Sequence, residues 1–139
     1  PTMQERVFHG FGAGDDLAVT DLEGVGRVGG LICWENRMPL ARYALYAQGL
    51  DLYATPTYDS AERSTPTMQH IAREAGCWVA CCGCAFRARD VPATLPGRAQ
   101  LFPEGEDEWI NPGDSVIVAP GGASVCTDSH SRPIHATAG

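Results

Sequence analysis

Runs of apolar residues recur along the chain and predict the strands of a sheet. The expected strands cover residues 17–20, 25–32, 50–55, 77–82 and 115–119, and a turn at 21–24 is expected to join the first two. The segment from 87 to 113 is rich in proline, glycine and charge, which predicts a long loop.

Two segments between these runs have helical periodicity. The first, Pro39 to Gln48, is expected to end at Gly49, with an apolar face of Leu40, Tyr43, Ala44 and Ala47. The second carries a stripe of Met68, Ile71, Ala72 and Ala75, and Gly76 closes it. The strand–helix–strand–helix order predicts an α/β layer architecture.

Cys33 occupies the junction between the strand that ends at Ile32 and the first helix. Amide groups at a helix N-terminus favour a thiolate, which is the reactive form of cysteine. The same amides can hold a developing oxyanion, and the N–H of Trp34 is a candidate donor. This position therefore predicts a nucleophilic cysteine.

Composition narrows the class of protein. A chain of 139 residues with 44% hydrophobic residues predicts one domain with a modest core. The net charge of −7 argues against nucleic acid as a partner. No apolar run is long enough to predict a membrane span. Six cysteines without a secretory leader indicate reduced thiols, so we expect a cytoplasmic protein.

The residues around Cys33, Gly29 to Arg42, resemble the nucleophile motif of the nitrilase branch of the carbon–nitrogen hydrolase superfamily. The Cys-Trp-Glu-Asn core at 33–36 is the form typical of nitrilases. Further segments resemble the family in the same order, so that the likeness covers Pro1 to Gly122. These segments are 1–6, 9–12, 54–59, 67–72, 101–103, 109–115 and 120–122.

This resemblance implies part of a four-layer α-β-β-α sandwich of the nitrilase type. It also implies a small nitrile and water as partners, no cofactor, and a homo-oligomer. Cys33 would attack the nitrile carbon to give a thioimidate and then an acyl-enzyme, which water releases as a carboxylic acid. A nitrile or cyanide hydratase, or an amidase of the same fold, is the alternative, because the fate of the tetrahedral intermediate depends on pocket geometry.

The chain departs from the family pattern in two ways. It contains no lysine, whereas the family's catalytic set is a cysteine, a lysine and a glutamate. We therefore expect a fragment of a longer protein that begins just after the lysine, and one that is inactive alone. Residues 123–139 form a tail with no apolar period, which predicts a truncation or a reading-frame error after a partial hydrolase domain at 1–122.

Six further residues are candidates for the site. Glu5 matches the family's second glutamate, which supports the lysine or positions water; a surface carboxylate is the other interpretation. Four more are candidates for substrate or oxyanion contacts, although helix capping, core packing or another structural role would also explain them. They are Glu35, His9, Thr57 and Tyr58. For the sixth, Trp34, we expect the ring itself to pack in the core.

Two readings of a different class remain open. Without a lysine, the chain could be a non-catalytic remnant or an assembly partner. Cys77, Cys82 and the Cys81–Cys84 pair, with His70 upstream, could form a small metal-binding module. A single pair of this kind in an apolar run lacks the second pair of most zinc sites, so we expect no metal.

Overall fold

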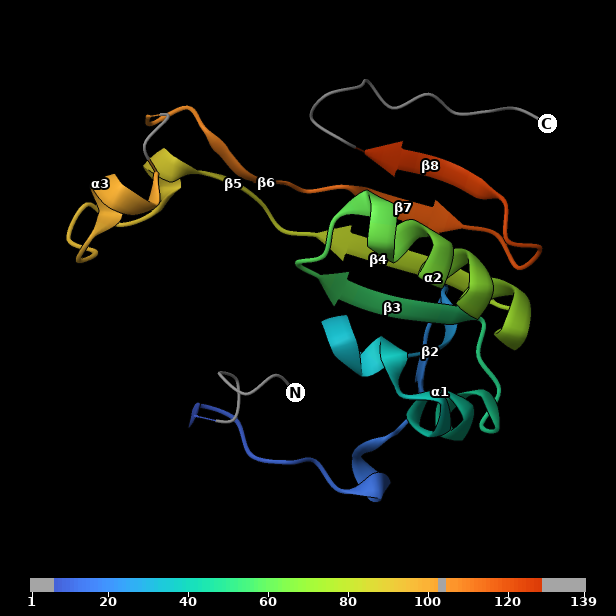
Figure 1. Ribbon diagram of the computed structural model, residues 1–139. Helices are drawn as coiled ribbons and strands as arrows, with labels where there is room; N and C mark the ends of the chain where they lie inside the picture. The colour runs from blue at the N-terminus through green and yellow to red at the C-terminus, as the bar shows by residue number, and fades with distance from the viewer. Residues whose placement is uncertain (1–6, 103–104, 129–139) are drawn as a thin grey trace.

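The computed structural model describes residues 7–102 and 105–128. Its main sheet has six strands in the order β1-β2-β3-β4-β7-β8 (Figure 1). Strands β2, β3 and β4 are parallel, whereas β1, β7 and β8 pair antiparallel with their neighbours. The strands are β1 (Thr20–Leu22), β2 (Gly26–Gly30), β3 (Leu52–Thr57), β4 (Trp78–Gly83), β7 (Ser115–Val118) and β8 (Ser124–Asp128).

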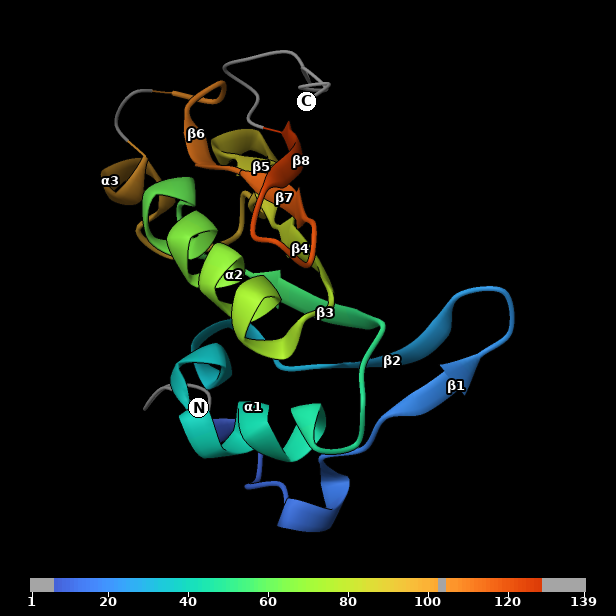
Figure 2. The same cartoon turned by 90° about the vertical axis from the view of Figure 1, so that its right-hand side faces the viewer.

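Two helices cover one face of this sheet. They are α1 (Pro39–Tyr46) and α2 (Ala61–Ala75), and α2 crosses β4 and β7 (Figures 1 and 2). Side chains from both helices and the covered face of the sheet form one core. Its members include Leu45, Tyr53, Met68, Ile71, Val79 and Val118. The α/β class and both helices that the sequence predicts are confirmed.

The opposite face of the sheet is more exposed. Successive side chains of a strand point to opposite faces, so Trp78 and Ile117 lie opposite the buried Val79 and Val116. Trp78 is 45% exposed and Ile117 is 42% exposed. The sheet therefore presents large apolar side chains on the face away from α1 and α2.

The predicted face of α1 is wrong. Leu40 is 85% exposed and Tyr43 is 67% exposed, whereas Arg42 and Leu45 are buried. The helix turns an arginine inward because Arg42 finds partners there. Its guanidinium contacts Glu74 at 3.1 Å and the main-chain oxygen of Asn36 at 2.7 Å. A periodicity argument assigns a charged residue to the outer face and cannot anticipate these partners.

Residues 87–113 are more ordered than the predicted loop. β5 (Ala85–Arg87) pairs with β6 (Trp109–Pro112), and this pair leads to an arm that projects from the main sheet (Figure 1). The arm also holds two short helices, η4 (Ala88–Asp90) and α3 (Arg98–Leu101). Arg87 and Arg89 both contact Asp107, and Arg98 pairs with Glu106. Ion pairs and main-chain hydrogen bonds hold this arm, and hydrophobic periodicity does not reveal them.

Strand boundaries also differ from the predictions. β3 begins and ends two residues later than expected, and β2 stops at Gly30, before Leu31 and Ile32. β8 lies within the segment for which no element was predicted, where it pairs antiparallel with β7. Within the described residues, no helix is long and apolar enough to cross a membrane.

Candidate active site

Cys33 begins a five-residue 3-10 helix, η3 (Cys33–Arg37), at the end of β2. The α-helix itself starts only at Pro39, so the expected α-helical N-terminus lies six residues beyond the cysteine. Cys33 has a φ of +50°, in the left-handed region. A non-glycine residue held there costs about 1 kcal/mol or more, and such strain concentrates at functional sites. The turn therefore presents Cys33 in a conformation that its surroundings must maintain.

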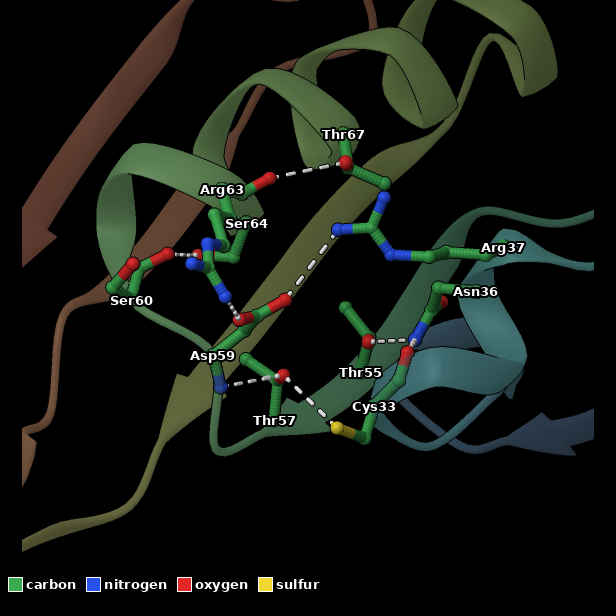
Figure 3. A network of polar contacts seen from close by, with 10 residues as sticks. All are labelled: Cys33, Asn36, Arg37, Thr55, Thr57, Asp59, Ser60, Arg63, Ser64 and Thr67. Atoms are coloured by element: carbon green, nitrogen blue, oxygen red, sulfur yellow. Dashed lines mark hydrogen bonds and ion pairs between the residues drawn. The ribbon is translucent and has the colours of Figure 1, made fainter. Parts of the chain in front are cut away.

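The thiol of Cys33 contacts the hydroxyl group of Thr57, at the end of β3. The Thr57 Oγ1 atom lies 3.6 Å from Sγ and accepts a hydrogen bond of 3.1 Å from the Asp59 main-chain N–H (Figure 3). Because its oxygen already accepts that bond, the hydroxyl proton is available to the sulfur. β2 and β3 are parallel neighbours, so their carboxyl ends bring Cys33 and Thr57 together.

A polar hollow opens beside the sulfur. Its volume of about 10 Å³ is close to the space that one water molecule needs. Arg37 crosses above it and contacts Asp59 at 3.5 Å (Figure 3). The Arg37 guanidinium also lies 4.7 Å from the centre of the Trp34 ring. The lining residues are Cys33, Asn36, Arg37, Thr57, Asp59, Ser64, Thr67 and Met68.

The main chain around Cys33 is hydrogen-bonded to the side chain of Asn36, which is 1% exposed. Its Nδ2 atom lies 2.7 Å from the Cys33 carbonyl oxygen, 3.1 Å from that of Leu31 and 2.7 Å from Thr55 Oγ1. Its Oδ1 atom accepts a hydrogen bond of 2.7 Å from the hydroxyl of Tyr53. One buried amide thus contacts both sides of the turn that presents the thiol.

Most of the other predicted residues lie away from this hollow. His9, Trp34 and Glu35 line a separate cavity of about 590 Å³, and Glu35 also accepts a hydrogen bond from the Ile32 N–H. The Trp34 ring is 51% exposed, so the expected core packing is wrong. Tyr58 packs against Phe86. Glu5 lies outside the described residues.

Sequence reasoning missed several residues of the hollow. Arg37, Asp59, Ser64 and Thr67 were not singled out, although Asp59 follows Thr57 closely. Asn36 was quoted only as part of the motif. The position of Asn36 in the motif could have indicated its role, because a short polar side chain three residues after the cysteine can form hydrogen bonds with the main chain of the turn.

Cys81 and Cys82 lie on β4, and Cys77 and Cys84 flank it. Among the described residues, no three His, Cys, Asp or Glu side chains are grouped closely enough to hold a metal ion. Burial raises the pKa of the Cys77 and Cys81 thiols to about 11, so both are protonated near neutral pH. Cys82 and Cys84 are exposed, and neither forms a disulfide.

Glu74 links α2 to α1 behind the site. Partial burial disfavours its charged form, but hydrogen bonds from Tyr46 and Arg42 outweigh burial and hold the pKa of Glu74 below its ordinary value. A carboxyl group with a lowered folded-state pKa stabilises the fold above its unfolded pKa. That stabilisation is lost as the pH falls through the folded value.

We therefore expect Glu74→Gln to destabilise the chain at pH 7 and to matter progressively less below about pH 4. The measurement is the urea midpoint of both proteins at pH 7, 5, 4 and 3. Tyr46→Phe removes one donor and keeps the carboxyl group, so its effect should be smaller. A difference in urea midpoint between wild type and Glu74→Gln that stayed the same from pH 7 to pH 3 would contradict the expectation.

Comparison with known proteins identifies a family and relatives that this chain resembles. The family model described as carbon–nitrogen hydrolase matches residues 1–133. A bifunctional nitrilase/nitrile hydratase of Lupinus angustifolius is 41% identical over 136 residues, covering 94% of this chain and 38% of the relative. A nitrilase of Bradyrhizobium diazoefficiens is 36% identical, covering 86% and 39%. The chain thus spans well under half the length of these relatives.

Solved structures share the fold. The crystal structure of Nit3 from Saccharomyces cerevisiae, a member of branch 10 of the nitrilase superfamily, aligns with a TM-score of 0.59 at 17% identity. That alignment covers 84% of this chain and 38% of Nit3. An amidase from Nesterenkonia sp. aligns with a TM-score of 0.53 at 20% identity, covering 81% of this chain and 36% of the amidase.

Proposed function

Because this chain belongs to the carbon–nitrogen hydrolase family, we propose that it carries the cysteine nucleophile of an enzyme that hydrolyses small nitriles. One observation supports this most directly: Cys33 occupies a strained turn, with its thiol beside a hydroxyl donor and a hollow of about one water's volume. The family membership supplies the reaction class, and the turn supplies the candidate nucleophile.

The proposed reaction begins when the Cys33 thiolate attacks the nitrile carbon. The nitrile nitrogen gains a proton, and a covalent thioimidate forms. Water then adds to the thioimidate carbon to give a tetrahedral intermediate. Loss of ammonia leaves a thioester, and a second water releases the carboxylic acid and the thiol. Thr57 is placed to donate a hydrogen bond to the departing sulfur.

The second product is an amide. The same tetrahedral intermediate gives an amide when the carbon–sulfur bond breaks in place of the carbon–nitrogen bond. The Lupinus relative is named a bifunctional nitrilase/nitrile hydratase, and this name supports proposing both the acid and the amide as products. We propose acid as the main product and amide as the minor one.

Other groups must complete this chemistry. Water addition needs a general base, and the 139 residues contain no lysine. We propose that Glu5 supplies one carboxylate of the active site. We also propose that the amine of the catalytic set comes from residues outside this chain. Trp34, Glu35, His9, Thr57 and Tyr58 remain proposed substrate or oxyanion contacts, with Thr57 the best supported by its distance to the sulfur.

We further propose a homo-oligomer in a reducing, cytoplasmic environment. The family resemblance supports the assembly, and six free cysteines support the compartment. Residues 1–122 would form the hydrolase part, and β8 extends regular structure past that boundary.

The experiment is product analysis on the complete enzyme with aliphatic, aromatic and arylaceto-nitriles. We expect ammonia and carboxylic acid in equal amounts, with amide as a smaller fraction. Amide without ammonia would replace the nitrilase proposal with a hydratase. No product from any nitrile, with a folded protein, would overturn the proposal.

A further inference from the structure

The turn at Cys33 has a second feature that its role as a nucleophile does not by itself explain. Its left-handed φ is unfavourable for a residue with a side chain, and the residue's own carbonyl oxygen points to a buried donor. The donor is the Nδ2 atom of Asn36, which also contacts the carbonyl oxygen of Leu31. Both ends of the strained segment are therefore attached to the same side-chain amide.

The amide has one allowed orientation. An NH₂ group is the only part of the side chain that can satisfy two carbonyl oxygens, which carry no hydrogen. Reversing the amide would place Oδ1 against those carbonyls and leave them without donors. The Tyr53 hydroxyl, which is fully buried, donates to Oδ1 and reinforces this orientation. Tyr53 thus fixes the amide, and the amide fixes the turn.

The main chain of Asn36 is held as well. The buried guanidinium of Arg42 donates to the Asn36 carbonyl oxygen at 2.7 Å, so the residue cannot shift without breaking contacts on its backbone and its side chain. We propose that Asn36 is a positioning residue that keeps Cys33 in its left-handed conformation and so aims the thiol at Thr57 and the hollow. This inference rests on the proposed function for its catalytic meaning, but its geometry is testable without turnover.

The test is the alkylation rate of Cys33 by iodoacetamide in the complete chain, measured by peptide mass spectrometry. Asn36→Asp keeps the shape and replaces the NH₂ donors with oxygen. We expect it to slow Cys33 alkylation about tenfold, because the thiol turns away from its hydroxyl donor. The buried Cys77 and Cys81 report global opening and should stay protected, while Cys82 and Cys84 should react at their wild-type rates.

Gln48→Glu is a matched control. The Gln48 amide also donates to two main-chain carbonyl oxygens, those of Leu17 and Ala44, and accepts one main-chain N–H. It makes the same kind of contacts at the other end of α1, so Gln48→Glu should leave Cys33 alkylation unchanged even if it lowers stability. If Asn36→Asp does not fold, Tyr53→Phe and Thr55→Val serve in its place, because each removes one hydrogen-bond partner of the Asn36 amide. Each of these variants should slow the alkylation of Cys33 about threefold.

Two results would overturn the proposal. One is an unchanged Cys33 rate in the variants that fold. The other is a change in Cys33 that Cys77 and Cys81 share, since that would show general loosening. In the complete enzyme, kcat for a nitrile should fall with the alkylation rate, with KM within about twofold. A wild-type enzyme without nitrile turnover, but with the expected alkylation pattern, would refute the proposed function and leave the positioning role intact.

Discussion

We expect Cys33→Ala to abolish the proposed nitrile hydrolysis by the complete enzyme, with kcat lowered on the order of 10⁴-fold or more. The size of this effect follows from the proposed mechanism, because without the sulfur no thioimidate would form and the reaction would lose its covalent route. The alanine variant should remain folded, since the side chain is partly exposed and, among the described residues, its thiol takes part in one hydrogen bond, to Thr57. Ammonia release is the measurement.

Two comparisons make this expectation specific. Cys82→Ala and Cys84→Ala remove exposed thiols outside the residues that line the hollow, and both should keep wild-type activity. Intact mass spectrometry during turnover should show an acyl adduct on wild type and none on Cys33→Ala. An alanine variant that retained more than a few per cent of the activity would remove Cys33 from the mechanism.

Gly30→Ala is the second large effect, and it acts on stability. A Cβ at this position would overlap the carbonyl oxygen of Ala54, which belongs to the neighbouring strand β3. β2 and β3 would have to separate at the pair Gly30–Ala54, three residues before Cys33. We expect a loss of about 3 kcal/mol in the free energy of unfolding, at the upper end for added volume in a packed site.

Urea unfolding followed by far-ultraviolet circular dichroism measures this loss. Gly121→Ala is the control, because a Cβ there meets no atom within 4 Å and its φ is not positive. That variant should shift the midpoint little. A Gly30→Ala protein as stable as Gly121→Ala would show that the two strands can move apart at small cost, contrary to the close approach of their backbones.

The sequence predicted those elements that carry their own periodicity. The stripe of Met68, Ile71 and Ala72 predicted α2, and all three side chains are buried. β8 has little apolar alternation and depends on β7 for its hydrogen bonds, so local reasoning missed it. The inward face of α1 was missed for a related reason, since Glu74, the ion-pair partner of the buried Arg42, lies 32 positions away in sequence.

The same distinction applies to the site. Cys33 was identified because its motif is continuous in sequence. Asn36 has partners 17 and 19 positions further along, Tyr53 and Thr55, and only the parallel pairing of β2 with β3 brings them close. Asp59 and Thr67 reach the hollow through β3 and α2 in the same way. The role of a residue that depends on such strand pairings cannot be predicted from its neighbours along the chain.

The exposed tryptophans have an optical consequence. Trp34, Trp78 and Trp109 are all at least 36% exposed, and arginines lie over the rings of Trp34 and Trp109. Their emission in the folded state therefore reports the surface, and unfolding should change its wavelength little. Emission from Trp78 would instead shift to the blue whenever another apolar surface covers its side of the sheet. Intrinsic fluorescence is thus a poor measure of folding for this chain and a sensitive measure of association.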